Sequence, residues 1–234
     1  MNSFADKTVV ITGAAGNLGR AVATHFSERG ARLGLIDLHT QSLTDEFGDA
    51  KRHVLVEANL LQADAAASAT EQILSRLGRI DVLCNLAGGF RMGQPVHETS
   101  VADWDFLLGL NAGSVLHMAK AVVPHMLTQG SGKIVNVGAF AAQRGAAQMG
   151  AYVASKSVVI RLTESMALEL RERGINVNCV LPTIIDTPDN RNAMPEADPS
   201  RWVATSELAN VIAFLASDQA NAVHGAALPV CGLS

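Results

Sequence analysis

Short apolar runs alternate with longer amphipathic segments along the chain. The longer segments repeat apolar residues at helical spacing, as in Leu18, Val22 and Phe26. The short runs have the length and β-branched content of strands, and they cover residues 7–12, 32–37, 53–58, 81–87, 132–138, 175–181 and 226–230. Strands separated by helices pair in parallel through right-handed crossovers. The pattern predicts an α/β fold, a doubly wound parallel sheet of about seven strands with helices on both faces.

One stretch breaks this alternation. Residues 182–205 contain four prolines and no clear period, so we expect an irregular segment there. A long loop in a compact domain is usually functional, which makes a substrate lid the natural interpretation. No linker or repeat divides the rest, and 234 residues suit one folded unit. We therefore expect a single domain over residues 1–234 with a lid over 182–205.

Composition excludes several classes of partner. The formal net charge is -4 and no basic block occurs, so we expect neither nucleic acid nor a membrane surface as a partner. The amino terminus shows no targeting pattern, and no uninterrupted apolar run reaches the ~18 residues of a membrane span, which favours a cytoplasmic protein. Cys84, Cys179 and Cys231 lie in or beside strand-like runs, so we expect buried thiols and no metal site.

The stretch TGAAGNLG at residues 12–19 follows the first strand run and opens the first helical segment. Gly13 permits a tight turn, Gly16 keeps side chains away from a pyrophosphate, and Gly19 lets the helix pack closely on the sheet. The helix amino terminus offers N–H groups to the phosphates. A structural turn could carry the same glycines, but their place between a strand and a helix favours a dinucleotide site.

An acidic residue, Asp37, ends the second strand run. Its carboxylate can accept hydrogen bonds from the adenosine ribose and repels a 2′-phosphate; the alternative is that it caps the following helix. No lysine or arginine stands at positions 14, 15, 38 or 39, where a cation would bind that phosphate. The sequence favours NAD(H) as the cofactor and leaves NADP(H) as the alternative.

The only tyrosine, Tyr152, lies at the start of an expected helix, and Lys156 follows on the same face one turn later. A nearby ammonium stabilises a phenolate, so we expect a pKa of Tyr152 below its ordinary ~10 and a usable acid–base group near neutral pH. The same spacing also occurs by chance in many helices. The pair therefore indicates an active site only in combination with the other motifs.

In their order along the chain, these motifs resemble the short-chain dehydrogenase/reductase family over essentially the whole sequence. The motifs that match are the Gly-rich turn at 12–19, Asp37, an Asn-x-Ala-Gly segment at 85–88, Asn111 in a central helix, Tyr152-x-x-x-Lys156 and a Pro-x-x-x-x-Thr segment at 182–187. The resemblance implies a Rossmann-fold oxidoreductase that transfers hydride between nicotinamide and a small-molecule carbonyl or imine. It also implies a homodimer or homotetramer.

The resemblance also assigns roles to residues. Tyr152 would donate or accept the proton, Lys156 would bind the nicotinamide ribose and tune Tyr152, and Asn111 would position a proton-relay water. The alternative for Asn111 is a polar residue that fills a helix bend. The cofactor would contact Gly13, Gly16, Asn17, Leu18, Gly19, Asp37, Asn59, Leu60, Ala87, Gly88, Tyr152, Lys156, Pro182, Ile185 and Thr187.

Several positions depart from the family pattern. Asn17 replaces a glycine, Asn59 an adenine-side aspartate, Leu86 an asparagine, and Thr183 the glycine after a proline. The largest departure is Ala139, which stands 13 positions before the tyrosine where the family has a serine that donates to the substrate oxygen. Losing such a donor to a localised oxyanion costs ~2.7–4 kcal/mol. A conjugated substrate that spreads its charge needs this donor less.

One branch of the family, dihydropteridine reductase, resembles the chain at these departures. The similar segments are AGGF (87–90), GAFAA (138–142), QMGAY (148–152) and the stretch at 181–202, whereas residues 100–127 look more like ordinary members. The residues that we expect to contact the substrate are Ala139, Gln148, Arg191 and Trp202. For Trp202 the alternative is an anchor between the lid and the body.

Three functions are consistent with the sequence. The first is an NAD(H)-dependent reductase of a small cyclic or conjugated carbonyl or imine, with a quinonoid dihydropterin as the sharpest substrate hypothesis. The second is a 3-oxoacyl or alcohol-type ketone reductase in which Gln143, Gln148 or a lid residue replaces the missing donor. The third is a non-catalytic dinucleotide-binding protein, which the retained Tyr152, Lys156 and Asn111 disfavour.

Overall fold

The seven expected strands form one parallel sheet in a computed structural model that describes residues 4–48 and 52–234. The strand order is β3-β2-β1-β4-β5-β6-β9. The strands span β1 Thr8–Thr12, β2 Arg32–Asp37, β3 His53–Glu57, β4 Val82–Asn85, β5 Gly132–Val137, β6 Ile175–Pro182 and β9 Ala227–Val230. The predicted single-domain, doubly wound α/β fold is thereby confirmed.

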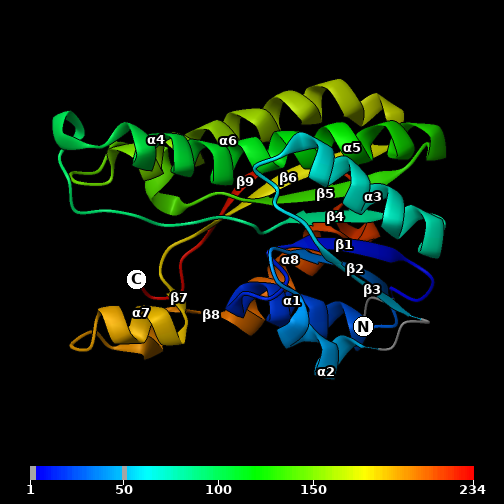
Figure 1. Ribbon diagram of the computed structural model, residues 1–234, viewed down its shortest axis with the longest axis horizontal. Coiled ribbons are helices and arrows are strands. Elements are labelled where there is room, and N and C mark those ends of the chain that lie inside the picture. Colours follow the sequence, from blue (N-terminus) through cyan, green and yellow to red (C-terminus); the bar gives the residue numbers. More distant parts are fainter. Residues whose placement is uncertain (1–3, 49–51) are drawn as a thin grey trace.

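Helices cover both faces of the sheet (Figure 1). On one face, α1 (Asn17–Ser27) packs against α8 (Thr205–Leu215), and Val22 and Phe26 share a buried cluster with Ile11 and Leu33. On the other face lie α3 (Ala63–Leu77), α5 (Ser114–Gln129) and α6 (Gly150–Leu170). A short α2 (Thr44–Phe47) precedes β3. Burial on both faces explains why the strands read as nearly continuous apolar runs.

The strand order reverses between β1 and β4. β1 pairs with β2 on one side and with β4 on the other. Because all seven strands are parallel, their carboxyl ends lie along one edge of the sheet, with Thr12, Asp37, Asn85, Val137 and Pro182 at the ends of five of them. Ligands of open α/β sheets bind beyond this edge at the switch point.

The 182–205 segment is more regular than its sequence suggests. Two short strands, β7 (Ile185–Asp186) and β8 (Val203–Ala204), pair in parallel, and α7 (Pro188–Ala193) lies between them. The expectation of an irregular stretch was wrong because Pro188 stands at the first position of α7, where a proline starts a helix rather than breaking it. Figure 1 shows these elements as a small unit beside the main sheet.

One long helical run is strongly apolar in composition. α4 (Val101–Leu108), a π-helical turn at Gly109–Gly113 and α5 together span Val101–Gln129, which by length and apolar composition alone could cross a membrane. A count of uninterrupted apolar residues did not detect it. However, Met118, Val122 and Met126 of this run belong to the buried cluster under the sheet. Its apolar composition is accounted for by that position in the core.

The cysteines follow the sequence expectation in part. Cys84 and Cys179 are buried, as expected, whereas Cys231 is only half-buried. All three are free thiols. Among residues 4–48 and 52–234, no cluster of three or more His, Cys, Asp or Glu side chains could hold a metal ion.

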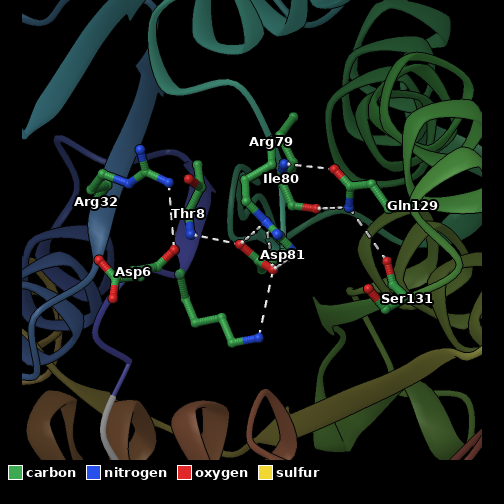
Figure 2. A network of polar contacts seen from close by, with 9 residues as sticks. Asp6, Thr8, Arg32, Arg79, Ile80, Asp81, Gln129 and Ser131 are labelled. Carbon is green, nitrogen blue, oxygen red and sulfur yellow. Dashed lines mark hydrogen bonds and ion pairs between the residues drawn. The ribbon is translucent and has the colours of Figure 1, made fainter.

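The amino-terminal edge of the sheet is closed by a polar network (Figure 2). The buried carboxylate of Asp81 accepts a hydrogen bond from the backbone N–H of Thr8 at 2.9 Å, and the Arg79 guanidinium donates to both of its oxygens at 2.6–3.1 Å. Beside it, the Gln129 side chain accepts from the N–H of Ile80 at 3.2 Å and donates to the Ile80 carbonyl at 2.8 Å. These contacts connect β1, the approach to β4 and the end of α5.

We expect Asp81→Ala to lower the free energy of unfolding by about 1–3 kcal/mol, because the Thr8 N–H would remain buried without its acceptor. Urea unfolding followed by circular dichroism measures this change. The control is Glu164→Ala, which removes a surface ion pair with Arg161 and should cost less than about 1 kcal/mol. Equal losses in the two variants would contradict the role given to the network.

Candidate active site

A cavity of about 2020 Å³ opens along the carboxyl edge of the sheet. It is lined by the Gly-rich turn, the ends of the central strands, the start of α6 and part of the 182–205 segment. Every residue expected to contact the cofactor, including Tyr152 and Lys156, lines this cavity. Of the four residues expected to contact the substrate, Ala139 lines the cavity and Gln148, Arg191 and Trp202 do not.

The glycines of the first turn have two different duties. Gly13 has φ +66°, and a Cβ there would lie 2.9 Å from the Cα of Ala87; at Gly19 it would lie 2.1 Å from the Gly13 carbonyl oxygen. These two residues must be glycine for the protein to pack. At Gly16 the nearest atom would be 3.4 Å away, which is ordinary contact. Gly16 is the N-cap of α1 and makes no side-chain cap, so the amino terminus of α1 faces the cavity without a capping side chain.

Asp37 holds the same turn from the end of β2. Its Oδ2 accepts from the N–H of Ala15 at 2.9 Å, and its Oδ1 accepts from the N–H of Leu38 at 2.7 Å. The carboxylate therefore binds the turn and does not cap the following helix, which was the alternative role. The nearby cation Arg20 donates to the Ser42 carbonyl at 2.7 Å and does not line the cavity.

Burial determines the ionisation of the Tyr152–Lys156 pair. Burial raises the pKa of Tyr152 to about 12 and lowers the pKa of Lys156 to about 8. The Lys156 ammonium, only 6% exposed, donates to the Val137 carbonyl at 2.8 Å. The expected lowering of the Tyr152 pKa was wrong for the protein without ligands, because burial removes hydration from the phenol and so disfavours its charged form. At neutral pH the site holds a protonated phenol beside an ammonium.

Asn111 lies in the π-helical turn, and its side chain is 1% exposed. Its Oδ1 accepts from the N–H of Gly89 at 2.8 Å, and its Nδ2 donates to the Gly89 carbonyl at 3.1 Å and to Ser155 Oγ at 2.9 Å. The side chain does not line the cavity, so it ties the loop after β4 to α6 rather than facing a ligand. Sequence reasoning missed Ser155, although it lies one helical turn after Tyr152.

The Ala139 position is apolar. Ala139 is 4% exposed and belongs to a buried cluster with Ala112, Cys179 and Leu181. Gln143, one of the side chains considered as a replacement donor, does line the cavity. Its Nε2 donates to the Phe140 carbonyl at 3.4 Å and has a second N–H for a ligand, whereas the cavity wall at Ala139 presents only a methyl group.

The three expected substrate residues outside the cavity are held elsewhere. Arg191 makes two hydrogen bonds to the Asp186 carboxylate at 2.6 and 2.7 Å. Trp202 is 6% exposed, which agrees with the anchoring alternative. Gln148 has φ +61°, and its carbonyl accepts from the N–H of Gly93 at 2.9 Å.

An apolar wall, which the sequence interpretation did not assemble, lines the cavity beside Tyr152. The Phe90 and Tyr152 rings meet edge to face, with centroids 4.8 Å apart and an interplanar angle of 86°. The other large apolar residues of this wall are Met92, Phe106, Leu110, Phe140, Met149 and Met194. They come from several separate segments, so no single stretch of sequence predicts the wall. Only Phe90, directly after the glycine pair at 88–89, belongs to a motif that the sequence analysis identified.

Known proteins provide an independent comparison. Residues 7–198 match the family described as short chain dehydrogenase. The chain is 34% identical over 239 residues to D-threitol dehydrogenase of Mycolicibacterium smegmatis, with 97% of this chain and 92% of the relative covered. It is 35% identical over 241 residues to cis-4-hydroxycyclohexanecarboxylate dehydrogenase of Sinomonas cyclohexanicum, with 98% and 97% covered. The solved structure of NAD⁺-bound xylitol dehydrogenase is similar with a TM-score of 0.90 and 28% identity, over 98% of this chain and 99% of that one.

Because Tyr152 is the only tyrosine, its ionisation can be followed directly by phenolate absorbance near 295 nm. We expect little ionisation of the folded, ligand-free protein at pH 10, where a free tyrosine is half ionised, since burial raises the pKa of Tyr152 to about 12. In urea the midpoint should return to ~10. Tyr152→Phe supplies the background, and half-ionisation of the folded protein near pH 10 would contradict the effect of burial.

Proposed function

The chain belongs to the short-chain dehydrogenase family, and from this premise we propose that it is an NAD(H)-dependent reductase of a small cyclic or conjugated carbonyl or imine. One observation carries the proposal: Tyr152 and Ala139 line the same cavity. A protonated phenol is available there to a substrate, and the family's second hydroxyl donor is missing. This combination suits substrates that delocalise the charge they develop.

The cavity fits a dinucleotide by its own features. Gly16 leaves the amino terminus of α1 without a capping side chain, and that terminus suits a pyrophosphate. At the other end of the cavity, Lys156, Ile185 and Thr187 would hold the nicotinamide ribose and carboxamide. The cofactor would supply the hydride at its nicotinamide ring.

NAD(H) is the cofactor that we propose. The Asp37 carboxylate lines the cavity and already accepts two backbone hydrogen bonds, so a 2′-phosphate beside it would meet a fixed negative charge. The guanidinium of Arg20 is engaged with Ser42 and Glu46 and gives no compensation. The NAD⁺-bound state of xylitol dehydrogenase supports this choice.

Tyr152 supplies the proton in the proposed reduction. A carbonyl or imine substrate gains the hydride at its carbon and takes the phenolic proton at its oxygen or nitrogen. A quinonoid dihydropterin takes both hydrogens at nitrogen, because its reduction forms no new C–H bond. In each case Tyr152 is left as a phenolate. Because the pKa of Tyr152 is about 12 in the free protein, the phenol is fully protonated at neutral pH and ready for this direction. The adjacent Lys156 ammonium stabilises the phenolate that forms, and the proton is then replaced from solvent.

The substrate end of the cavity favours a planar ring that can pack against aromatic and methionine side chains. Phe90 and Phe140 line it, together with Met149 and Met194. A quinonoid dihydropterin is the most specific substrate that we propose, because it is planar and conjugated and needs no serine hydroxyl. This finer assignment rests on Ala139 and on the sequence likeness of residues 181–202 to dihydropteridine reductase.

A second candidate function is a ketone reductase of the 3-oxoacyl or alcohol type. One observation favours it: Gln143 lines the cavity and can donate through its side-chain amide. The named activities of the relatives also concern alcohols, a polyol in one and a cyclohexane ring in the other. The two candidates differ in whether the substrate needs a second donor.

We also propose that the 182–205 segment acts as the substrate lid, that the protein is a cytoplasmic homodimer or homotetramer, and that nucleic acids and membranes are not its partners. An apolar patch of Val96, Val101 and Trp104 beside α6 supports a contact between copies. Sedimentation velocity gives the number of copies, and a monomer at micromolar concentration would contradict the assembly.

To test the cofactor, we expect Asp37→Asn to raise the affinity for NADPH relative to NADH by about tenfold or more, because it removes one negative charge and keeps a hydrogen-bond acceptor for the turn. Fluorescence titration measures both affinities. Glu57→Gln is the matched control, since Glu57 ends the neighbouring strand but does not line the cavity. An unchanged ratio in Asp37→Asn would contradict the proposed selectivity.

To test the substrate, NADH oxidation is measured with quinonoid dihydropterins, cyclic ketones, 3-oxoacyl thioesters and quinones. We expect the highest kcat/KM on dihydropterins, and Tyr152→Phe should lose about a hundredfold or more in kcat on any active compound. Turnover of dihydropterins no faster than of simple ketones would reject the pterin assignment. Tight NADH binding without turnover of any compound would favour the non-catalytic alternative.

A second variant in the same assay separates the two candidate functions. If the native substrate does not need the second donor, Ala139→Ser should raise kcat/KM on ketones by about tenfold or more and leave dihydropterin turnover nearly unchanged. Ala142→Ser is the control, because Ala142 is buried nearby but does not line the cavity. No gain on ketones would indicate that Gln143 or another group already donates.

A further inference from the structure

The last residues of the chain contact both ends of the lid. At the first end, the Thr183 hydroxyl donates to the Cys231 carbonyl at 2.9 Å and lies 2.8 Å from Ser234 Oγ. At the second end, the N–H of Leu233 donates to the Arg201 carbonyl at 2.9 Å, and the Arg201 guanidinium donates to the Leu233 carbonyl at 2.7 Å. Residues 231–234 therefore bridge two points that are 18 positions apart in the sequence.

The bridge is closely packed as well as hydrogen-bonded. Gly232 has φ +57°, and a Cβ on it would lie 2.9 Å from the Arg201 carbonyl oxygen and 3.1 Å from that of Trp202. A side chain at position 232 would push the tail away from the lid. The two ends of the lid are also joined directly, since the N–H of Val203 donates to the Ile184 carbonyl at 2.9 Å.

Thr183 departs from the family pattern, which places a glycine after the proline. Thr183 lines the cavity itself and precedes the lid residues Ile185, Asn190 and Met194, which line it too. A shift at either end of the lid would therefore displace part of the wall that faces the substrate. The observations connect the tail to the cavity through the lid.

We propose that residues 231–234 form a clasp that fixes the lid over the cavity, with Thr183 as the positioning residue that fastens it. The clasp sets how well the lid wall contacts a substrate and leaves proton transfer by Tyr152 unchanged. This inference rests on the proposed function for its kinetic consequence. Its structural consequence, a lid held in place by the tail, is independent of any turnover.

Three variants test the clasp. Thr183→Val removes the hydroxyl, Thr183→Ser keeps it, and Gly232→Ala pushes the tail from the opposite side. Limited trypsin digestion with identification of the fragments by mass spectrometry reports opening of the lid, because Arg191 and Arg201 both lie within it. We expect cleavage after these arginines to be about five- to tenfold faster in Thr183→Val and in Gly232→Ala, and unchanged in Thr183→Ser.

The kinetic readout uses whichever compound of the panel is turned over. We expect KM for that compound to rise about fivefold in Thr183→Val with kcat changed less than about twofold and NADH affinity unchanged, and Thr183→Ser should restore the wild-type KM. Wild-type cleavage rates in both Thr183→Val and Gly232→Ala would overturn the clasp. So would equal effects of Val and Ser at position 183, or accelerated cleavage at Arg76 and Arg161 in the body of the protein. If the wild type turns over no compound, the proposed function fails while the digestion still decides the clasp.

Discussion

The site depends on one close approach, between the turn after β1 and the loop after β4. A glycine at position 13 lets the two backbones come together where a Cβ would lie 2.9 Å from Ala87, and the Thr12 hydroxyl accepts from the N–H groups of Leu86 and Ala87. Gly19 then packs α1 against the same turn. The contact bridges the two strands at which the sheet order reverses, and the cavity opens directly beyond it.

The two edges of the sheet are built for opposite purposes. At the amino edge, charged and polar groups around Asp81 satisfy one another, which favours stability. At the carboxyl edge, burial disfavours the charged forms of both Tyr152 and Lys156, so a neutral phenol and an easily deprotonated ammonium lie side by side. The proton transfer that we propose is thereby placed at the carboxyl edge, away from the polar groups that stabilise the amino edge.

The sequence predicted the sheet well, and the residues that it assigned to the cofactor all line one cavity. Both faces of the sheet are buried, so each strand reads as an apolar run, and the nucleotide-side residues cluster at strand ends that a parallel sheet must bring together. The residues at the substrate end of the cavity were harder to predict. Arg191 is paired with Asp186 inside its own segment, and Trp202 is buried, facts that depend on tertiary packing. The prediction of a lowered Tyr152 pKa was wrong for the same reason, since burial is not visible in a local motif.

The contact of Asn111 with Gly89 has a thermodynamic consequence. The Asn111 side-chain amide has two N–H donors and a carbonyl acceptor. It uses one donor and the acceptor on the main chain of Gly89, as a paired peptide group would, and its Nδ2 also donates to Ser155. The loop that carries Phe90 is thereby fixed during folding, as the next strand of a sheet would fix it. The conformational entropy of that loop is lost before any ligand arrives, so binding a substrate against it requires less ordering than a mobile loop would demand.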